Sequence, residues 1–147
     1  GKTRPLLLYT ITVPRSLTVK IDDYTSTITL SDLKGDVAID TYTGTVQATG
    51  LGGELTLDTY TGDIQAGFTT LTAPVSIETF SSALRLTLPP DAGFDLETDL
   101  MRADQLTVSD QLSLPPLTEG NYNGPVNGGG PLVSIDSHSG TVELRTP

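Results

Sequence analysis

The amino-acid sequence predicts an all-β fold, a parallel β-solenoid (or β-helix) of about six to seven rungs. Three observations support this prediction. A segment of 18–20 residues recurs along the chain, apolar and polar residues alternate with a period of two inside each copy, and no stretch shows the helical period of 3.6 residues. Thr, Ser, Asp and Gly replace many apolar residues, which make up only 36% of the chain, and this composition favours short strands joined by turns.

The repeat is clearest in two neighbouring copies. Residues 36–48 are Asp-Val-Ala-Ile-Asp-Thr-Tyr-Thr-Gly-Thr-Val-Gln-Ala, and residues 54–66 are Glu-Leu-Thr-Leu-Asp-Thr-Tyr-Thr-Gly-Asp-Ile-Gln-Ala. Weaker copies flank them, and the aligned apolar position recurs after 18, 18, 20, 19 and 39 residues, at Ile21, Ile39, Leu57, Ile77, Leu96 and Ile135. The last step spans about two repeats and therefore contains an insertion.

Such a repeat cannot bury its apolar face alone, so we expect the copies to stack with about 4.8 Å between strands. Each copy is expected to run as strand, glycine turn, strand and leucine-containing turn, with positive φ at some of the turn glycines Gly44, Gly62 and Gly140. The predicted buried ladders are Val37/Leu55/Val75/Val133, Ile21/Ile39/Leu57/Ile77/Leu96/Ile135, Ile28/Val46/Ile64/Leu84/Val142, the turn leucines Leu33/Leu51/Leu71, and an inward threonine ladder, Thr41/Thr59/Thr79, hydrogen-bonded along its length.

An antiparallel β-sandwich is the alternative fold. It also produces alternating strands with glycine turns. Sandwich strands face different neighbours, however, and have no reason to repeat at a constant step, so the constant step favours the solenoid.

The whole chain, residues 1–147, is expected to be one domain. Residues 5–16 would be a strand that covers the N-terminal end, 17–109 the repeats, 110–131 a Pro/Gly-rich excursion and 132–147 a closing rung. The closing copy is expected to end the stack. Its exposed strand edge would be protected from pairing with another chain by Glu143, Arg145 and Pro147. The sequence also has the character of a piece of a longer protein.

Charge and composition exclude several classes of function. The net charge is −10, which opposes binding to a phosphate backbone and makes nucleic acid a poor partner. The chain has no cysteine and a single histidine, His138, which excludes a disulfide framework, a thiolate metal site and a multi-histidine metal site. No run approaches the 18 apolar residues that a membrane-spanning helix requires.

The repeats, the Gly-Gly-Gly-Pro segment at 128–131 and the closing Ser-Ile-Asp-Ser-His-Ser-Gly-Thr-Val-Glu-Leu segment at 134–144 resemble a bacterial adhesin-type domain family of unknown function. That family is similar to the head domains of autotransporter adhesins. The resemblance covers roughly residues 10–147, with its most specific part at 128–142, and is blurred at 99–115. It implies a β-solenoid fold and a location at the bacterial cell envelope or outside the cell, and it provides no catalytic residues.

The candidate site is a stripe of outward-facing residues just before the glycine turns. Its rings are Tyr24, Tyr42, Tyr60, Phe80 and His138, and the alternation places Asp22, Asp40, Asp58, Glu78 and Asp136 on the same face. As a ligand-binding stripe, it would offer flat rings to sugar faces and carboxylates to hydroxyl groups. The competing interpretation is structural, because stacked aromatic residues also stabilise a parallel ladder.

No cofactor is expected. Carboxylates stacked at strand spacing repel each other by about 1 kcal/mol in water, and weak Ca²⁺ binding would relieve this, but the Gly-Gly-x-Gly-x-Asp calcium repeat is absent. Catalysis is not expected either. No carboxylate pair is singled out for glycoside chemistry, and Ser81, Ser82, Ser137 and Ser139 have only His138 as a base and no nucleophile motif. The Thr-x-Thr triplets resemble an ice-binding face, but the outward tyrosine between them would spoil its flatness.

We therefore expect a non-enzymatic module of the bacterial envelope or surface, used for adhesion, scaffolding or interaction with a glycan or protein. The alternatives are a carbohydrate-active lyase or hydrolase on a β-helix scaffold and the subunit of a self-assembling filament. A monomer is expected, with end-to-end stacking as a further possibility, and any membrane attachment would lie in segments outside this sequence.

Overall fold

A computed structural model describes residues 7–11, 18–90, 92–102, 105–109 and 121–146. They form one sheet of ten strands and contain no α-helix. The strands are β1 (Leu7–Ile11), β2 (Val19–Ser31), β3 (Val37–Leu51), β4 (Leu55–Phe68), β5 (Val75–Thr87), β6 (Phe94–Leu100), β7 (Leu106–Val108), β8 (Asn121–Val126), β9 (Leu132–Ser137) and β10 (Thr141–Arg145). The prediction of an all-β fold with a mainly parallel sheet is thus confirmed.

Every strand pairing is parallel except that of β6 with β8. The register follows the repeat: Ile39 pairs with Ile21 on one side and Leu57 on the other, and Ile77 continues the row. The predicted row Ile28/Val46/Ile64/Leu84/Val142 is also continuous. Equivalent positions of successive copies therefore lie side by side, which excludes the antiparallel sandwich.

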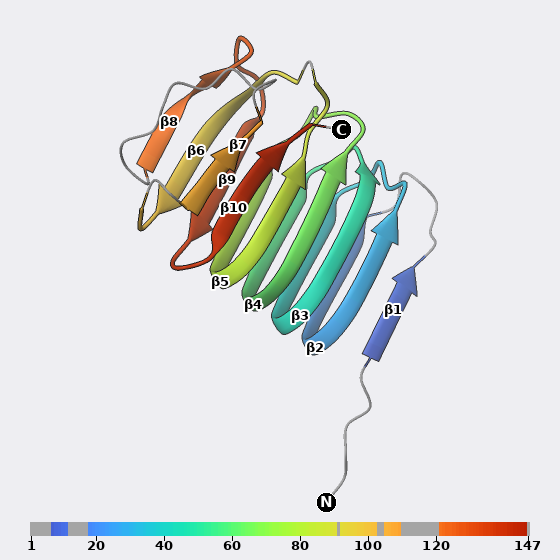
Figure 1. The fold of residues 1–147 in the computed structure, drawn as a ribbon. Helices are drawn as coiled ribbons and strands as arrows, with labels where there is room; N and C mark the ends of the chain where they lie inside the picture. The colour runs from blue at the N-terminus through green and yellow to red at the C-terminus, as the bar shows by residue number, and fades with distance from the viewer. Residues whose placement is uncertain (1–6, 12–17, 91, 103–104, 110–120, 147) are drawn as a thin grey trace, which may run out of the picture.

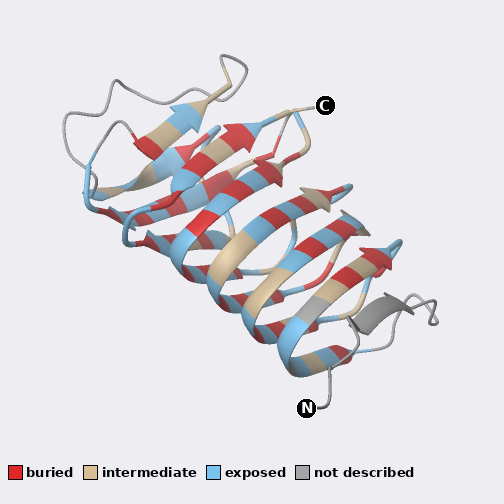
Figure 2. Ribbon diagram, turned by 60° about the horizontal axis from the view of Figure 1, so that its bottom comes forward, coloured by how far each residue is buried: buried red, intermediate tan, exposed pale blue. Residues whose placement is uncertain are grey.

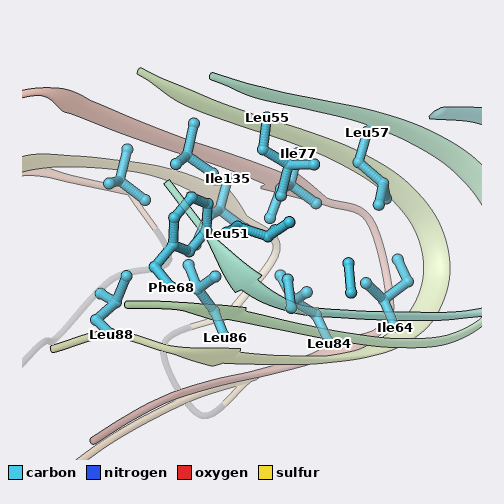
Figure 3. Packing of buried hydrophobic residues seen from close by; sticks show 14 of the residues in the cluster. Leu51, Leu55, Leu57, Ile64, Phe68, Ile77, Leu84, Leu86, Leu88 and Ile135 are labelled. Carbon is cyan, nitrogen blue, oxygen red and sulfur yellow. The ribbon is translucent and has the colours of Figure 1, made fainter. Parts of the chain in front are cut away.

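The long strands β2–β5 bend near their middle, so that each contributes to two layers (Figure 1). Buried and exposed residues alternate along both halves of these strands (Figure 2). Figure 3 shows Leu57 and Ile77 of one layer opposite Ile64 and Leu84 of the other. Because these side chains are at most 2% exposed, the core is a narrow apolar seam enclosed by the two layers.

The bend depends on a glycine at Gly62. Its φ is +135°, a conformation that side chains disfavour, and a Cβ there would collide with the carbonyl of Gly44 on the neighbouring strand. Gly44 and Gly140 are not among the positive-φ residues, so the prediction holds for one turn glycine of the three. Gly140 is needed for another reason, because a Cβ there would collide with the backbone of Ser82.

Two features of the predicted core are wrong. Phe68, not Leu71, continues the row of Leu33 and Leu51: Leu51 pairs with Phe68, and Leu71 is only partly buried beside the core. The inward threonines are buried as predicted, but the hydroxyls of Thr41 and Thr59 donate to backbone carbonyls rather than to one another. Thr41 Oγ1 donates to the carbonyls of Tyr24 and Thr43 at 3.4 Å, and Thr59 Oγ1 to that of Thr61 at 3.3 Å.

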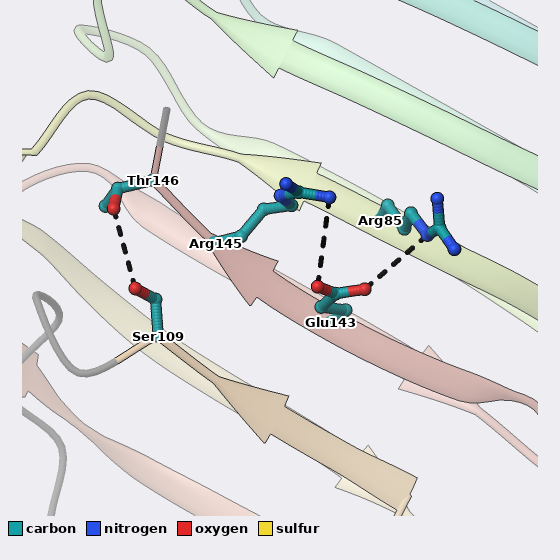
Figure 4. A network of polar contacts seen from close by, with 5 residues as sticks. All are labelled: Arg85, Ser109, Glu143, Arg145 and Thr146. Carbon is teal, nitrogen blue, oxygen red and sulfur yellow. Dashed lines mark hydrogen bonds and ion pairs between the residues drawn. The ribbon is translucent and has the colours of Figure 1, made fainter.

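The last copy of the repeat does not end the stack. Strand β9 lies between β5 and β6, and β10 lies between β5 and β7, so residues 132–145 are inserted between segments that precede them in the chain (Figure 1). The expectation of an exposed edge at β10 is therefore wrong. Glu143 instead contacts Arg85 of the adjacent strand, with 3.5 Å between Oε2 and Nε, and Arg145, with 3.9 Å between Oε1 and Nη1 (Figure 4). Pro147 lies outside the described residues.

Leu96 also occupies a different row from the predicted one. It pairs with Val133, and Thr98 pairs with Ile135, so the copy that contains β6 is displaced by two residues. Both Leu96 and Thr98 are buried. The displacement keeps the same side chains inward while changing which of them are neighbours.

The glycine-rich segment before β9 crosses the start of β6. The Asp95 amide donates to the carbonyl of Pro131 at 3.0 Å, and the Asn127 side-chain amide donates to the carbonyl of Ala92 at 3.0 Å. A Cβ on Gly130 would collide with the carbonyl of Gly93. Glycines are therefore required here by close backbone contact, and they hold β6 between β8 and β9.

The remaining expected segments are described in part. Strand β1 lies beside the second half of β2, with Tyr9 paired to Ile28, whereas residues 5, 6 and 12–16 of the expected covering strand lie outside the described residues. Residues 110–120 of the expected excursion also lie outside them, and the following residues form β8. None of the described residues belongs to a helix that is long and apolar enough to cross a membrane.

Candidate functional site

The five predicted rings form one continuous stack across β2, β3, β4, β5 and the residue after β9. Adjacent ring centroids are 4.6–4.9 Å apart and adjacent planes are within 14° of parallel. This spacing equals that of neighbouring strands, so the sheet itself sets it. The rings belong to Tyr24, Tyr42, Tyr60, Phe80 and His138.

The rings are exposed. Tyr24 is 60% exposed and Phe80, the least exposed of the four large rings, is 40% exposed. Each ring stands two residues after an exposed carboxylate, as the predicted alternation requires, and a buried threonine or serine lies between the two for every ring except Tyr24. Rings and carboxylates therefore share one outward face near the bend of each long strand.

The carboxylates form a second continuous row, parallel to the stack. Asp40 pairs with Asp22 and Asp58, and the row continues through Glu78 to Asp136. Asp99 of β6 extends it, because Asp136 pairs with Asp99. Asp99 was not among the predicted residues, because β6 is displaced by two residues from the alignment that placed Leu96 in the row of Ile77.

Between these rows lies a groove of about 770 Å³. The rings and carboxylates of β2–β5 line it, together with Thr41, Thr59 and Thr79. It runs across the strands and spans at least β2–β5. A ligand in it would therefore meet the same pair of groups, a ring and a carboxylate, once per strand.

The stack changes how the rings can bind a ligand. Both faces of Tyr42, Tyr60 and Phe80 are covered by neighbouring rings. A sugar cannot lie flat on these rings, so the expected sugar platform does not exist along the interior of the stripe. What the groove presents is ring edges, the phenol hydroxyls of three tyrosines and a line of carboxylates. These groups suit hydrogen bonding and cationic partners better than stacking.

The surroundings of Asp136 disfavour its charged form. Desolvation by the surrounding chain, with a further contribution from the charge of Asp99, raises the pKa of this carboxyl above its usual range. No ion pair joins Asp22, Asp40, Asp58, Glu78 or Asp136 to a basic side chain of the described part of the protein. The row is therefore a surface of uncompensated negative charge.

The geometry of the row does not form a metal cage. Among the residues that the structure describes, no three His, Asp or Glu side chains are grouped so as to hold a metal ion. The carboxylates follow one another along a line, whereas Ca²⁺ requires six to eight oxygen ligands around one point.

Two of the serines near His138 make no hydrogen bond to its imidazole. The hydroxyls of Ser82 and Ser137 are buried and have no hydrogen-bond partner, so neither donates to the imidazole. The His138 ring instead lies on Phe80, with centroids 4.6 Å apart, and the backbone amide of Ser139 donates to the carbonyl of Phe80 at 2.8 Å. These contacts are structural.

The second layer has a different surface. Gln47, Gln65, Arg85 and Glu143 form an outward row there, and Arg85, Arg145 and Glu143 make the contacts of Figure 4. All three charged side chains are between 39% and 57% exposed, so their ion pairs contribute little to stability. The continuous row of carboxylates therefore belongs to the layer that carries the rings, whereas the second layer carries a mixed row of amide, basic and acidic side chains.

Comparison of the chain with family models, curated proteins and solved structures finds no match.

Proposed function

We propose that the chain is a non-enzymatic binding module whose ligand lies along the groove between the ring stack and the carboxylate row. One observation carries this proposal: the same ring and carboxylate recur on successive strands and flank a groove of about 770 Å³. A row of equal subsites suits an extended polymer, whereas an enzyme active site needs one position that differs from its neighbours.

The architecture that supports this function is a β-solenoid of six rungs. These are β2, β3, β4, β5, β9 with β10, and β6 with β7. The parallel register, the two layers and the enclosed apolar seam support it, as does the 18–20-residue repeat. The stacking of equal rungs would explain why the subsites are evenly spaced.

The ligand we propose is a linear polymer that carries positive charge, either a glycan with amino groups or an extended basic protein segment at a cell surface. Its cations would lie against Asp40, Asp58 and Glu78, and its polar groups would bond to the tyrosine hydroxyls. Nucleic acid would be repelled by this surface. Ca²⁺ would bind weakly and compete with such a ligand.

We propose a role in adhesion, scaffolding or interaction at the bacterial envelope. This location rests on the resemblance of residues 10–147, above all 128–142, to an adhesin-type family. Fractionation of bacteria that produce the full-length protein tests it, and recovery in the cytosol alone would refute it.

The binding test compares chitosan oligosaccharides, which are cationic, with their fully N-acetylated and neutral counterparts. We expect the cationic series to bind more tightly, with affinity that rises with chain length and falls with added salt. Asp40→Asn combined with Asp58→Asn should weaken binding at least several-fold, while Asp63→Asn, which removes an exposed charge outside the groove, should not. Equal binding of the two series, or equal loss in both variants, would refute the proposed groove. Cleavage of either series would favour a carbohydrate-active enzyme.

A further inference from the structure

The stack of rings crosses a junction between two parts of the chain. Tyr24, Tyr42, Tyr60 and Phe80 belong to β2–β5, whereas His138 follows β9. The carboxylate row crosses at the same place, where Glu78 pairs with Asp136. The stripe is therefore completed by residues from a distant segment.

That segment is a coherent block, formed by β6–β10. Strand β6 pairs with β8 on one side and β9 on the other, and β10 pairs with β7. The side-chain amide of Gln105 donates to the carbonyl of Gly140 at 2.6 Å, and the glycine-rich segment holds the start of β6 through the carbonyls of Ala92 and Pro131. These contacts keep the block together independently of β5.

The block meets the rest of the protein mainly through one strand edge. Residues 75–79 of β5 pair with β9, and residues 83–87 pair with β10. Val133, Ile135, Val142 and Leu144 are at most 1% exposed and complete the core there. The covalent link is the short segment from Leu88 to Gly93, which contains Pro89 and Pro90.

We propose that the β5 edge also accepts the β6–β10 block of a second copy of this chain, so that two chains exchange blocks and form a dimer. Every contact at the junction is then made between chains instead of within one chain. Exchange of an identical element is a low-cost route to a dimer, because only the connecting segment changes. The six linking residues, 88–93, reach about 20 Å when extended, which allows a crossing between adjacent molecules.

The exchange has a functional consequence. In the exchanged dimer, His138 and Asp136 of each chain complete the ring and carboxylate rows of its partner. Two grooves are then joined in one particle, which raises the avidity for a polymer that spans both. The dimer itself does not depend on whether the groove binds a ligand.

Concentration decides between the two forms. Closure within one chain is favoured at dilution, and the net charge of −10 also opposes association. Folding at high concentration favours exchange, and the dimer then persists because its return requires the opening of both junctions.

The test uses the absence of cysteine from the chain. One full-length chain carries Glu78→Cys and a second, with a different mass tag, carries Asp136→Cys. The two chains are mixed, unfolded and refolded together, once at high and once at low concentration. The refolded samples are then oxidised. Residues 78 and 136 are register partners, and the spacing of parallel strands permits a disulfide. A disulfide between the two chains can therefore form efficiently only when β9 of one lies on β5 of the other.

The control pair is Asp40→Cys with Asp136→Cys. Both residues are exposed in the same row, but β4 and β5 lie between them. We expect the first pair to give several-fold more linked heterodimer than the control after refolding at high concentration, and a smaller excess at low concentration. Equal yields from the two pairs, or no linked heterodimer from the first pair, would overturn the proposal. A matching dimer of the unmodified chain, stable on dilution by light scattering, would support it independently.

Discussion

The phenyl ring of Phe80 lies on the imidazole of His138, with 4.6 Å between centroids, and Glu78 pairs with Asp136 two residues earlier on the same two strands. One pair of strands thus carries both the ring stack and the carboxylate row from the N-terminal repeats onto the copy that contains β9. The same strand register positions both rows. A substitution that disturbs the strand pairing should therefore disturb both rows, and a substitution in either row should change the stability of the sheet.

Tyr60→Ala should lower the free energy of unfolding by about 1–3 kcal/mol, because the ring contacts both Tyr42 and Phe80 and each aromatic pair contributes about 0.5–1.5 kcal/mol. Urea denaturation followed by circular dichroism measures this loss. Thr56→Ala, an exposed substitution on the same strand where the neighbouring copy already has Ala38, is the control and should change little. If both variants lost the same stability, the stack would have no structural role.

Gly62→Ala should destabilise the protein by about 1–3 kcal/mol or more, because φ is +135° and the new Cβ would collide with the carbonyl of Gly44. The matched control is Gly67→Ala on the same strand. Its Cβ would meet the Thr87 side chain at an ordinary 3.8 Å, so we expect about 0.4–1 kcal/mol of added stability from the restricted unfolded chain. Changes of the same sign in the two variants would contradict this account of the bend.

The sequence predicted the copies from β2 to β5 because each repeats the same alternation at a nearly constant step. Ile39, Leu57 and Ile77 could be aligned without ambiguity, and the rings at Tyr42, Tyr60 and Phe80 followed from that alignment. The period of two also assigned the inward and outward faces of β3–β5 correctly, whereas Ile21 of β2, predicted to be buried, is only partly buried.

The position of β6 could not be predicted in this way. A shift of two residues leaves the same side chains inward, so the pattern fits Leu96 or Thr98 equally well in the isoleucine row. A repeat search also cannot give the order of the last copies in the sheet. The alignment of Ile135 with Ile77 does not show that β9 lies between β5 and β6. The covered ring faces depend on ring orientation, which no pattern of residue types contains.

Asp136→Asn should stabilise the protein at neutral pH. The folded chain raises the pKa of Asp136 through desolvation and the charge of Asp99, so the folded state binds this proton more tightly than the unfolded state. The stability that this proton contributes is fully present below the pKa of Asp136 in the unfolded chain. It is lost as the pH rises through the pKa of Asp136 in the folded protein. The variant should therefore be more stable than the unmodified protein at neutral pH, and this advantage should vanish near about pH 3.5.

Urea unfolding of both proteins across this pH range measures the difference. Asp63→Asn, which removes an exposed carboxylate from the other layer, should change stability by less than about 0.5 kcal/mol throughout. A destabilised Asp136→Asn protein at neutral pH would show that this carboxylate is held by favourable contacts rather than crowded.

Replacement of both Glu143 and Arg145 by Val should leave the protein monomeric at micromolar concentration. Strand β10 is paired with β5 on one side and β7 on the other, so it has no free edge for these charges to protect. The exposed contacts of Glu143 with Arg85 and Arg145 contribute only about 0.2–1 kcal/mol each, so the stability should fall slightly. Light scattering gives the mass, and Gln47→Val with Thr49→Val adds two valines at the equivalent positions of β3 as a control. Association of the Glu143/Arg145 variant alone would mean that the charges on β10 keep molecules apart, whereas association of both variants would reflect only the added apolar surface.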